Sequence, residues 1–437
     1  MQQKFLDFIN VNNLFTADEK ILLAVSGGVD SVCLSHLFKQ AGFKFAIAHC
    51  NFQLRAEDSE EDEAFVEALA QSLEVPFHSV KFDTNKNAEE GRISIQMAAR
   101  NLRYDWFAKL MRAHGYVKLA TAHHQNDNIE TVLFNLAKGT GISGLRGIKK
   151  ANNGTIRPLL FAMKSEILAY ATKHSLEWRE DISNASDKYH RNYIRQKVVP
   201  ALTAINPSFE QNFSFTTDRI ALAEKALAKM VDQYRERCVV QKTDHLQIDC
   251  KQIGEYALLY EILRPYGFSL RQSVDIFSDS EISGKEYFSE QYWLVKDREY
   301  LVLTEKPTER QSVLLEQDDR AMTAGKLKLN ISVTENQVKI LPDPAIAILD
   351  YDKLKFPLKI RDWKEGDKFR PLGMRGKKKV SDFMIDNKIP LNLKKSYRVL
   401  ESAGEIVWLI GLRIDERYKI NETTEKVYQI ELDKNHV

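Results

Sequence analysis

The chain has 437 residues, which at about 150 residues per domain predicts roughly three domains. Its 43% hydrophobic, 28% charged and 10% aromatic residues are typical of a globular protein and exclude a disordered tail or a fibre. Because 63 basic and 61 acidic side chains leave a net charge of only +2, the overall charge indicates no particular class of partner.

The sequence offers no membrane span and no secretory signal. No stretch approaches the ~18 consecutive apolar residues of a spanning helix, and the start, MQQKFLDFINVNN, lacks an apolar core and a small-residue cleavage site. The cysteines predict no disulfide framework, because none of them forms a Cys-x-x-Cys pair: Cys33, Cys50, Cys238 and Cys250. We therefore expect a soluble, cytoplasmic protein with no membrane partner.

Short apolar runs alternate with longer amphipathic ones over the first two hundred residues. Strands are predicted for residues 21–25, 43–48, 77–82 and 117–122. Helices are predicted between them, for residues 31–40, 60–73, 94–113 and 128–138. This alternation predicts an α/β domain, a doubly wound parallel sheet covered by helices on both faces. Ligands of such sheets bind at the carboxyl ends of the strands.

The pattern changes after Pro207. Helical spacing of apolar residues from 213 to 237 predicts one long helix that opens a second domain. Residues 292–295 and 300–303 predict a hairpin, and the polar stretch 306–325 indicates a linker. Further strands are predicted for residues 340–341, 346–349, 358–360, 398–400 and 406–410. The predicted domains are residues 1–207, a mostly helical 208–320, and a small basic α+β domain, 321–437.

The hexapeptide Ser26-Gly27-Gly28-Val29-Asp30-Ser31 joins the first predicted strand to the first predicted helix. Its glycines allow a sharp turn with exposed N–H groups, and the helix start near Ser31 adds its positive dipole end, so the loop predicts an anion site. The lysine and spacing of the nucleoside-triphosphatase P-loop are absent. Asp30 would repel a phosphate unless a cation lay between them, which makes it a candidate Mg²⁺ ligand. The alternative is a turn that merely caps a helix.

This hexapeptide resembles the loop of the PP-loop ATP pyrophosphatases, which cleave ATP between its α and β phosphates and transfer AMP to a substrate oxygen. The resemblance implies that ATP is a substrate and that residues 26–31 bind it. The loop does not choose the second substrate, because the group includes GMP and NAD synthetases, argininosuccinate synthetase, tRNA thiolases and a tRNA-lysidine synthetase.

Polar motifs follow the other predicted strands. Arg100 and Arg103 share one helix face, an arrangement that is more often solvated or ion-paired than catalytic. His123, Asp127 and Glu130, at spacings of four and three after the fourth strand, could point together at a metal or a reacting group. The alternative is a capping cluster, because Asp127 near a helix start is stabilising in either case.

Two later stretches are candidates for binding nucleic acid. Tyr189-His190-Arg191-Asn192-Tyr193-Ile194-Arg195, shortly after Glu180-Asp181-Ile182-Ser183-Asn184, mixes bases with tyrosines in a way that suits phosphate pairing and base stacking. Residues 359–379 hold nine Lys or Arg against three acids and predict a polyanion-binding surface. The alternatives are an ordinary surface helix and a solvated lysine run.

In their order, these motifs resemble the tRNA(Ile)-lysidine synthetase family of the PP-loop group over nearly the whole chain. The shared elements are the phosphate loop, H-x-N-x-x-L-R (49–55), A-R-x-x-R-Y, H-H-x-x-D-x-x-E-T, R-P-L-L, D-x-S-N with R-N-x-I-R, and G-D-x-F-x-P-L-G-M (366–374). Many members carry paired aspartates in the fourth element. Here the first is Asn126, which leaves Asp127 as the carboxylate of that pair.

The resemblance implies a two-step ligation on an isoleucine tRNA with a cytidine at the wobble position. The C2 oxygen of that cytidine attacks the α phosphorus of ATP, and the ε-amine of L-lysine then displaces AMP to form lysidine. It also implies site roles: Asp30 and Asp127 as Mg²⁺ ligands, Arg103 as a charge stabiliser, and His123, Glu130 and Arg195 as positioning residues. The predicted tRNA contacts are Arg191, Arg370, Arg375, Lys377, Lys378 and Lys379.

Two rival functions stay open at this point. A tRNA thiolase of the PP-loop group would need reactive cysteines or iron–sulfur ligands, and an RNA-binding protein without catalysis would need no intact phosphate loop. The sequence does not decide whether the protein is a monomer or a homodimer.

Overall fold

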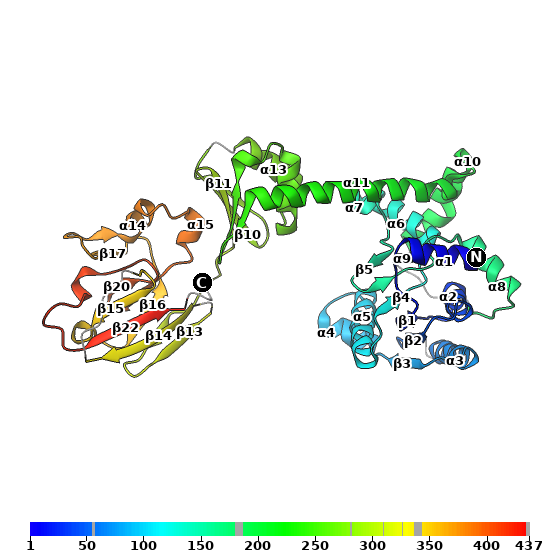
Figure 1. Cartoon of the computed structure of the whole chain (residues 1–437), viewed down its shortest axis with the longest axis horizontal. Coiled ribbons are helices and arrows are strands. Elements are labelled where there is room, and N and C mark those ends of the chain that lie inside the picture. Colours follow the sequence, from blue (N-terminus) through cyan, green and yellow to red (C-terminus); the bar gives the residue numbers. More distant parts are fainter. Residues whose placement is uncertain are drawn as a thin grey trace. The chain divides into compact units, whose positions relative to one another are not determined.

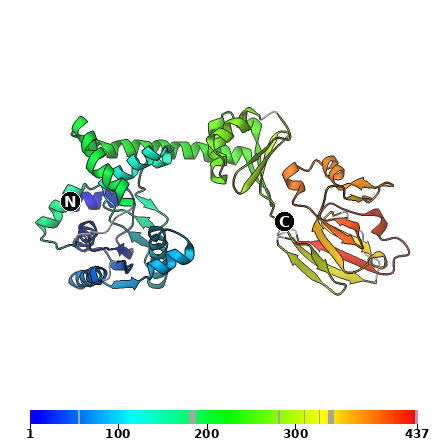
Figure 2. The same ribbon diagram turned by 180° about the vertical axis from the view of Figure 1, so that it is seen from behind.

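The computed structural model describes residues 1–54, 57–179, 187–279, 282–308, 310–325, 327–335 and 343–433. It divides into two compact units, Met1–Leu227 and Ala228–Val437 (Figures 1 and 2). The boundary falls within a single long helix, α11 (Phe209–Cys238), which the sequence predicts over 213–237. Within the described ranges, no helix is both long and apolar enough to cross a membrane.

A six-stranded sheet forms the centre of the first unit, in the order β3-β2-β1-β4-β6-β5. Its strands are β1 (Ile21–Ala24), β2 (Phe45–Asn51), β3 (Phe77–Lys81), β4 (Lys118–Ala120), β5 (Ala151–Asn152) and β6 (Thr155–Ile156). All neighbours pair in parallel except β5 and β6, which are antiparallel at one edge. The four strands predicted from the sequence are confirmed, whereas β5 and β6 are too short to give an apolar pattern.

Helices cover both faces of this sheet (Figure 1). Successive β1 residues point to opposite faces: Ile21 and Leu23 are buried with Phe38 of α2, while Leu22 is buried with Phe107 of α5. The helices of the first unit are α1 (Gln2–Val11), α2 (Val29–Gln40), α3 (Glu57–Ser72), α4 (Thr84–Gly91), α5 (Ile95–His114), α6 (Gln125–Lys138), α7 (Ile142–Leu145), α8 (Lys164–Lys173), α9 (Asp187–Tyr193), the π-helical turn η1 (Ile194–Val198) and α10 (Val199–Ile205). The predicted doubly wound sheet is confirmed.

The first half of the second unit combines helices with a five-stranded antiparallel sheet, β7-β8-β11-β10-β9. Its elements are β7 (Val239–Gln241), β8 (Leu246–Asp249), α12 (Tyr256–Leu263), α13 (Leu270–Ser278), β9 (Glu286–Phe288), β10 (Tyr292–Asp297) and β11 (Tyr300–Glu305). The predicted hairpin is β10 and β11. The other three strands show little apolar alternation, so the region holds more strand than its sequence predicts.

The C-terminal part of the second unit is rich in strands. Two sheets, β12-β16-β19-β20-β21 and β13-β14-β22-β15, share one apolar core that includes Trp408 and Tyr428. The elements are β12 (Val313–Leu315), β13 (Ala321–Ala324), β14 (Leu327–Thr334), β15 (Ile346–Asp350), β16 (Leu358–Asp362), β17 (Lys368–Phe369), β18 (Lys378–Lys379), α14 (Val380–Asp386), α15 (Leu391–Lys394), β19 (Arg398–Ser402), β20 (Glu405–Leu409), β21 (Arg413–Ile414) and β22 (Val427–Leu432).

Two predictions need correction or lie outside this description. The linker predicted for 306–325 is wrong in part, because β12 and β13 lie within it and are paired with β16 and β14. The strand predicted at 340–341 lies outside the described residues, as do the motif residues 180–184 and Arg55.

Candidate active site

A cavity of about 1040 Å³ lies at the carboxyl ends of β1, β2 and β4, where a parallel sheet is expected to bind its ligand. Ser26, Gly28, Asp30 and Ser31 of the phosphate loop form part of its wall. The cationic residues of the wall outnumber its three aspartates: they are Arg100, Arg103, Arg146, Lys149, Arg157, Arg179 and Arg191. This charge balance suits a polyanionic ligand such as a nucleotide.

The phosphate loop turns at Gly27, whose φ of +92° lies in the region that favours glycine. Gly28 is the N-cap of α2, which begins at Val29, so Asp30 lies in the first helical turn. Val29 itself is buried in the core rather than facing the cavity. Ser31 closes the turn, because its hydroxyl donates to the Gly28 carbonyl at 2.9 Å. The backbone N–H of Ser31 also donates to that carbonyl, at 3.0 Å. The N–H groups of Val29 and Asp30, the first two residues of α2, have no acceptor within the helix, which suits a phosphate.

Asp30 and Asp127 border one buried histidine. The Nε2 atom of His124 lies 3.8 Å from Oδ2 of Asp30 and 3.6 Å from Oδ2 of Asp127. Asp127 also accepts a hydrogen bond from the backbone N–H of His124 at 2.9 Å, so the predicted capping role is confirmed. Among the described residues, no cluster of three or more His, Cys, Asp or Glu side chains could hold a metal. Mg²⁺ usually takes only one or two carboxylates together with phosphates and water, and this pair fits that mode.

His123 lies on the cavity wall beside these carboxylates, and its Nδ1 is 2.9 Å from the Thr121 hydroxyl. Burial lowers the pKa of His123 to about 4, although Asp127 opposes the shift. The imidazole is therefore neutral near pH 7.

The two arginines of α5 stack on aromatic rings. The guanidinium of Arg103 lies 5.0 Å from the ring centre of Phe52, and that of Arg100 lies 5.0 Å from the ring centre of Tyr104. Both arginines line the cavity. The stacking limits their motion while leaving the charge available to an anion. It differs from the predicted alternative of carboxylate pairing on the helix surface.

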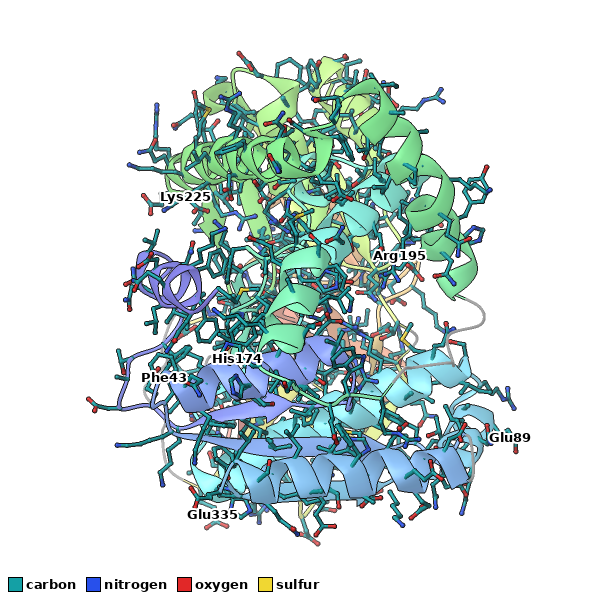
Figure 3. The ribbon with its side chains drawn as sticks, turned by 90° about the vertical axis from the view of Figure 1, so that its right-hand side faces the viewer. Phe43, Glu89, His174, Arg195, Lys225 and Glu335 are labelled. Carbon is teal, nitrogen blue, oxygen red and sulfur yellow. The ribbon has the colours of Figure 1, made fainter. Side chains whose placement is uncertain are left out.

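Glu130 and Arg195 form an ion pair behind the wall of the cavity. The Nε atom of Arg195 donates to Oε1 of Glu130 at 2.6 Å, and the glutamate is buried. Arg195 lies in the π-helical turn η1 that follows α9 (Figure 3), a distortion often found at functional sites. Neither side chain lines the cavity, whereas Arg191 of α9 does.

Comparison with known proteins decides the family. Residues 1–202 match the model of the PP-loop domain, 241–306 the TilS substrate binding domain, and 358–432 the TilS substrate C-terminal domain. A tRNA(Ile)-lysidine synthase of Parabacteroides distasonis is 39% identical over 425 residues, 96% of this chain and 97% of that protein. One of Bacteroides thetaiotaomicron is 37% identical over 431 residues, 98% of each chain. The chain belongs to the tRNA(Ile)-lysidine synthase family.

Solved structures give weaker likenesses. The U34-tRNA thiolase NcsA from Methanococcus maripaludis aligns with 50% of this chain and 76% of its own, at 16% identity and a TM-score of 0.43. A TilS C-terminal domain aligns with 28% of this chain and 97% of its own, at 19% identity and a TM-score of 0.26.

In this member of the lysidine synthase family, the cysteines near the site are unsuited to sulfur chemistry. Burial raises the pKa of both Cys33 and Cys50 to about 12, so that both are protonated thiols near pH 7. Cys33 lies on α2 and is fully buried in the core of the first unit. Together with the matches to lysidine synthase domains and relatives, this favours the lysidine synthase function over the thiolase alternative.

The basic segment of the family's C-terminal domain forms a turn between β17 and β18. Arg375, Lys377 and Lys379 are exposed there, and Lys378 is ion-paired with Asp386. Arg370 is half-buried before the turn, and its backbone N–H donates to Asp415 at 2.8 Å. Three of the five predicted cations of this segment are thus fully available to a polyanion.

The motifs did not identify every cation of the cavity in this lysidine synthase. Four of these cations lie in segments with no predicted site role: Arg146, Lys149, Arg157 and Arg179. Burial lowers the pKa of Arg157, with repulsion from Arg100 adding to the effect. A signal was available for Arg157, since it opens the R-P-L-L motif.

Proposed function

We propose that this protein ligates L-lysine to C2 of the wobble cytidine of an isoleucine tRNA, using ATP and passing through an adenylated cytidine. The observation that carries the proposal is the cavity itself. It combines the phosphate loop, the carboxylates of Asp30 and Asp127, and a wall with more cations than carboxylates at the carboxyl ends of the strands, in a chain whose relatives over full length are lysidine synthases.

In the first step, the chain's own groups bind and orient the triphosphate. The N–H groups and the dipole of the α2 start bind phosphate oxygens. Asp30 and Asp127 would hold Mg²⁺, which supplies charge neutralisation when bound. Arg103, fixed on Phe52, would stabilise the charge that develops as pyrophosphate leaves.

In the second step, the lysine amine must reach C2 without its proton. His123 is neutral near pH 7, so it would not repel an approaching ammonium and could accept its hydrogen bond. The Glu130–Arg195 pair would hold α6 and η1 together behind the wall and so keep Asp127 and Arg191 in place. In the second unit, the exposed bases of the 375–379 turn would bind tRNA phosphates.

The test is mass analysis of cytidine in isoleucine tRNA incubated with the protein, ATP, Mg²⁺ and L-lysine. We expect a nucleoside that carries lysine and one AMP released for each modified cytidine. Matched reactions would omit lysine or use a tRNA with uridine at the wobble position, and neither should yield the product. Sulfur in the product would support the thiolase function instead, and tRNA binding without turnover of ATP would leave only an RNA-binding protein.

A further inference from the structure

Lys164 forms an ion pair with Asp30, the acidic residue of the phosphate loop. Its Nζ atom lies 2.6 Å from Oδ1 and 2.8 Å from Oδ2 of Asp30, so the ammonium bridges both oxygens. Lys164 is the first residue of α8, far from Asp30 along the chain. The two side chains are 37% and 29% exposed, so solvent screens the pair only in part.

We propose that Lys164 is a positioning residue for Asp30 that neutralises this carboxylate beside the phosphate loop. This inference rests on the proposed function, in which residues 26–31 bind ATP. An unpaired Asp30 would repel the phosphates from the first turn of α2. A lysine that balances this charge would let the loop accept nucleotide before a divalent cation is in place.

Asn126 fixes the backbone that carries Lys164. The backbone N–H of Lys164 donates to Oδ1 of Asn126 at 2.9 Å. Beside it, the backbone N–H of Gln125 donates to the carbonyl of Ala162 at 2.9 Å. Two hydrogen bonds therefore hold the start of α8 against the start of α6, the helix that also carries Asp127. The side-chain carbonyl of Asn126 thus helps to hold Lys164 in place.

A purely structural ion pair between α2 and α8 is the competing explanation. In that case, loss of Lys164 would weaken nucleotide binding equally with and without metal, because the damage would be to the shape of the loop. A charge-balancing lysine predicts an unequal effect. When Mg²⁺ is bound, the metal offsets the charge of Asp30 and the lysine matters less.

The experiment measures the Kd of α,β-methylene ATP, whose bridging carbon blocks cleavage, by calorimetry on the full chain in Mg²⁺ and in EDTA. Lys164→Met and Lys164→Gln should each weaken binding about ten-fold more in EDTA than in Mg²⁺, while Lys164→Arg should resemble the wild type. The double variant Lys164→Met/Asp30→Asn should bind in EDTA within about two-fold of Asp30→Asn alone, because no charge is left to balance.

Lys39→Met is the matched control. Lys39 lies in the last turn of the same helix, is 40% exposed and pairs with Glu74 at 3.1 Å, away from the phosphate loop. Its ratio of EDTA to Mg²⁺ affinities should equal that of the wild type. Thermal unfolding of each variant separates misfolding from loss of charge, and Lys164→Gln replaces Lys164→Met in the double variant if the latter does not fold.

Distinct results overturn the inference and the proposed function. Equal losses in EDTA and Mg²⁺ for the neutral Lys164 variants would show a structural pair and refute the inference alone. Wild-type protein that binds the analogue only with Mg²⁺ would also refute it, because the lysine would then not substitute for the metal. Absence of binding under both conditions would refute the proposed function and the inference with it.

Discussion

Two groups of cations in this protein are built differently. In the cavity, Arg100 and Arg103 are stacked on aromatic rings, and the carboxylate of Asp30 is bridged by Lys164. In the turn between β17 and β18, Arg375 and Lys377 project into solvent. A fixed cation can stabilise charge at one point of a reaction without reorganising. An exposed flexible cation contributes to the binding of any nearby phosphate and releases counterions as it does so. If the proposed function holds, this contrast predicts that the cavity of the first unit carries the chemistry and that the exposed turn of the second unit contributes tRNA affinity.

Removal of a carboxylate of the cavity should have the largest effect, because it tests directly whether the first unit carries the chemistry. Asp30→Ala or Asp127→Ala should lower cytidine-dependent release of pyrophosphate by about a thousand-fold or more, because each would remove a proposed ligand of the ion that neutralises the phosphates. Release of pyrophosphate is measured with isoleucine tRNA and lysine present. Asp105→Ala, on the exposed face of α5, is the control. Retained release in either cavity variant would remove that residue from the mechanism.

A stacked arginine should matter more for turnover than for tRNA affinity. We expect Arg103→Ala to lower kcat by about a hundred-fold while the Kd for tRNA changes little, because the fixed guanidinium acts on charge that develops in the reaction. Phe52→Leu, which removes the ring under the guanidinium, should cost less than Arg103→Ala. Arg112→Ala in the exposed last turn of α5 should behave as the wild type. A Kd that rises as much as kcat falls would place Arg103 among the ordinary phosphate contacts.

The exposed turn should show the opposite behaviour. Changing Arg375, Lys377 and Lys379 together to Ala should weaken tRNA binding at low salt and reduce the log–log salt slope by about 2 to 3, at roughly 0.9 per phosphate contact. Affinity for ATP should not change. Filter binding across a salt series measures the slope. An unchanged slope would show that the turn is a solvated lysine run, the alternative that the sequence left open.

The sequence predicts those parts of the site that are local in the chain. The strand before Ser26, the glycine turn and the helix after that turn are contiguous in the sequence. They can therefore be recognised without knowledge of the fold. The same holds for His123 and Asp127, which lie just before and within the first turn of α6 and line the cavity. Glu130 of the same motif does not line the cavity and instead pairs with Arg195. Patterns of this kind also gave the parallel strands β1 to β4.

The sequence pattern could not predict which side chains pair when they lie far apart along the chain. Lys164 meets Asp30, and Arg195 meets Glu130, across separations that no spacing rule spans. The sequence predicts a linker over β12 and β13 because these strands are only three and four residues long and lie within a polar stretch, so neither is long enough to give a strand pattern. The extra cations of the cavity were missed for a related reason, since they come from three separate connections, and only the folded sheet brings these to one wall.

The neutrality of His123 predicts an effect on acid stability. The pKa of His123 is lowered to about 4 in the folded state, against an ordinary value near 6.5 in the unfolded chain. Between these values the unfolded chain binds a proton that the folded chain does not, so stability falls as pH drops from about 6.5 to 4. Compared with the wild type, His123→Asn should lose about 2 to 3 kcal/mol less over this window. Urea unfolding at pH 7 and pH 4.5 measures the difference, and parallel losses in both proteins would contradict it.

The smallest expected effect concerns Asn126, which departs from the paired aspartates of the motif. Its Nδ2 atom donates to Oε1 of Glu210 at 3.3 Å while its Oδ1 atom accepts from Lys164, so both ends of the amide are used. Asn126→Asp would keep the second bond but place a carboxylate against Glu210, the acidic residue in the first turn of α11. We expect a loss of about 0.5 to 1 kcal/mol in the free energy of unfolding of the first unit. Adding Glu210→Gln should restore it, because an amide can donate to the new carboxylate. Chemical unfolding of the four proteins of this cycle gives the coupling, and a value near zero would mean that the amide at 126 is not matched to the glutamate at 210.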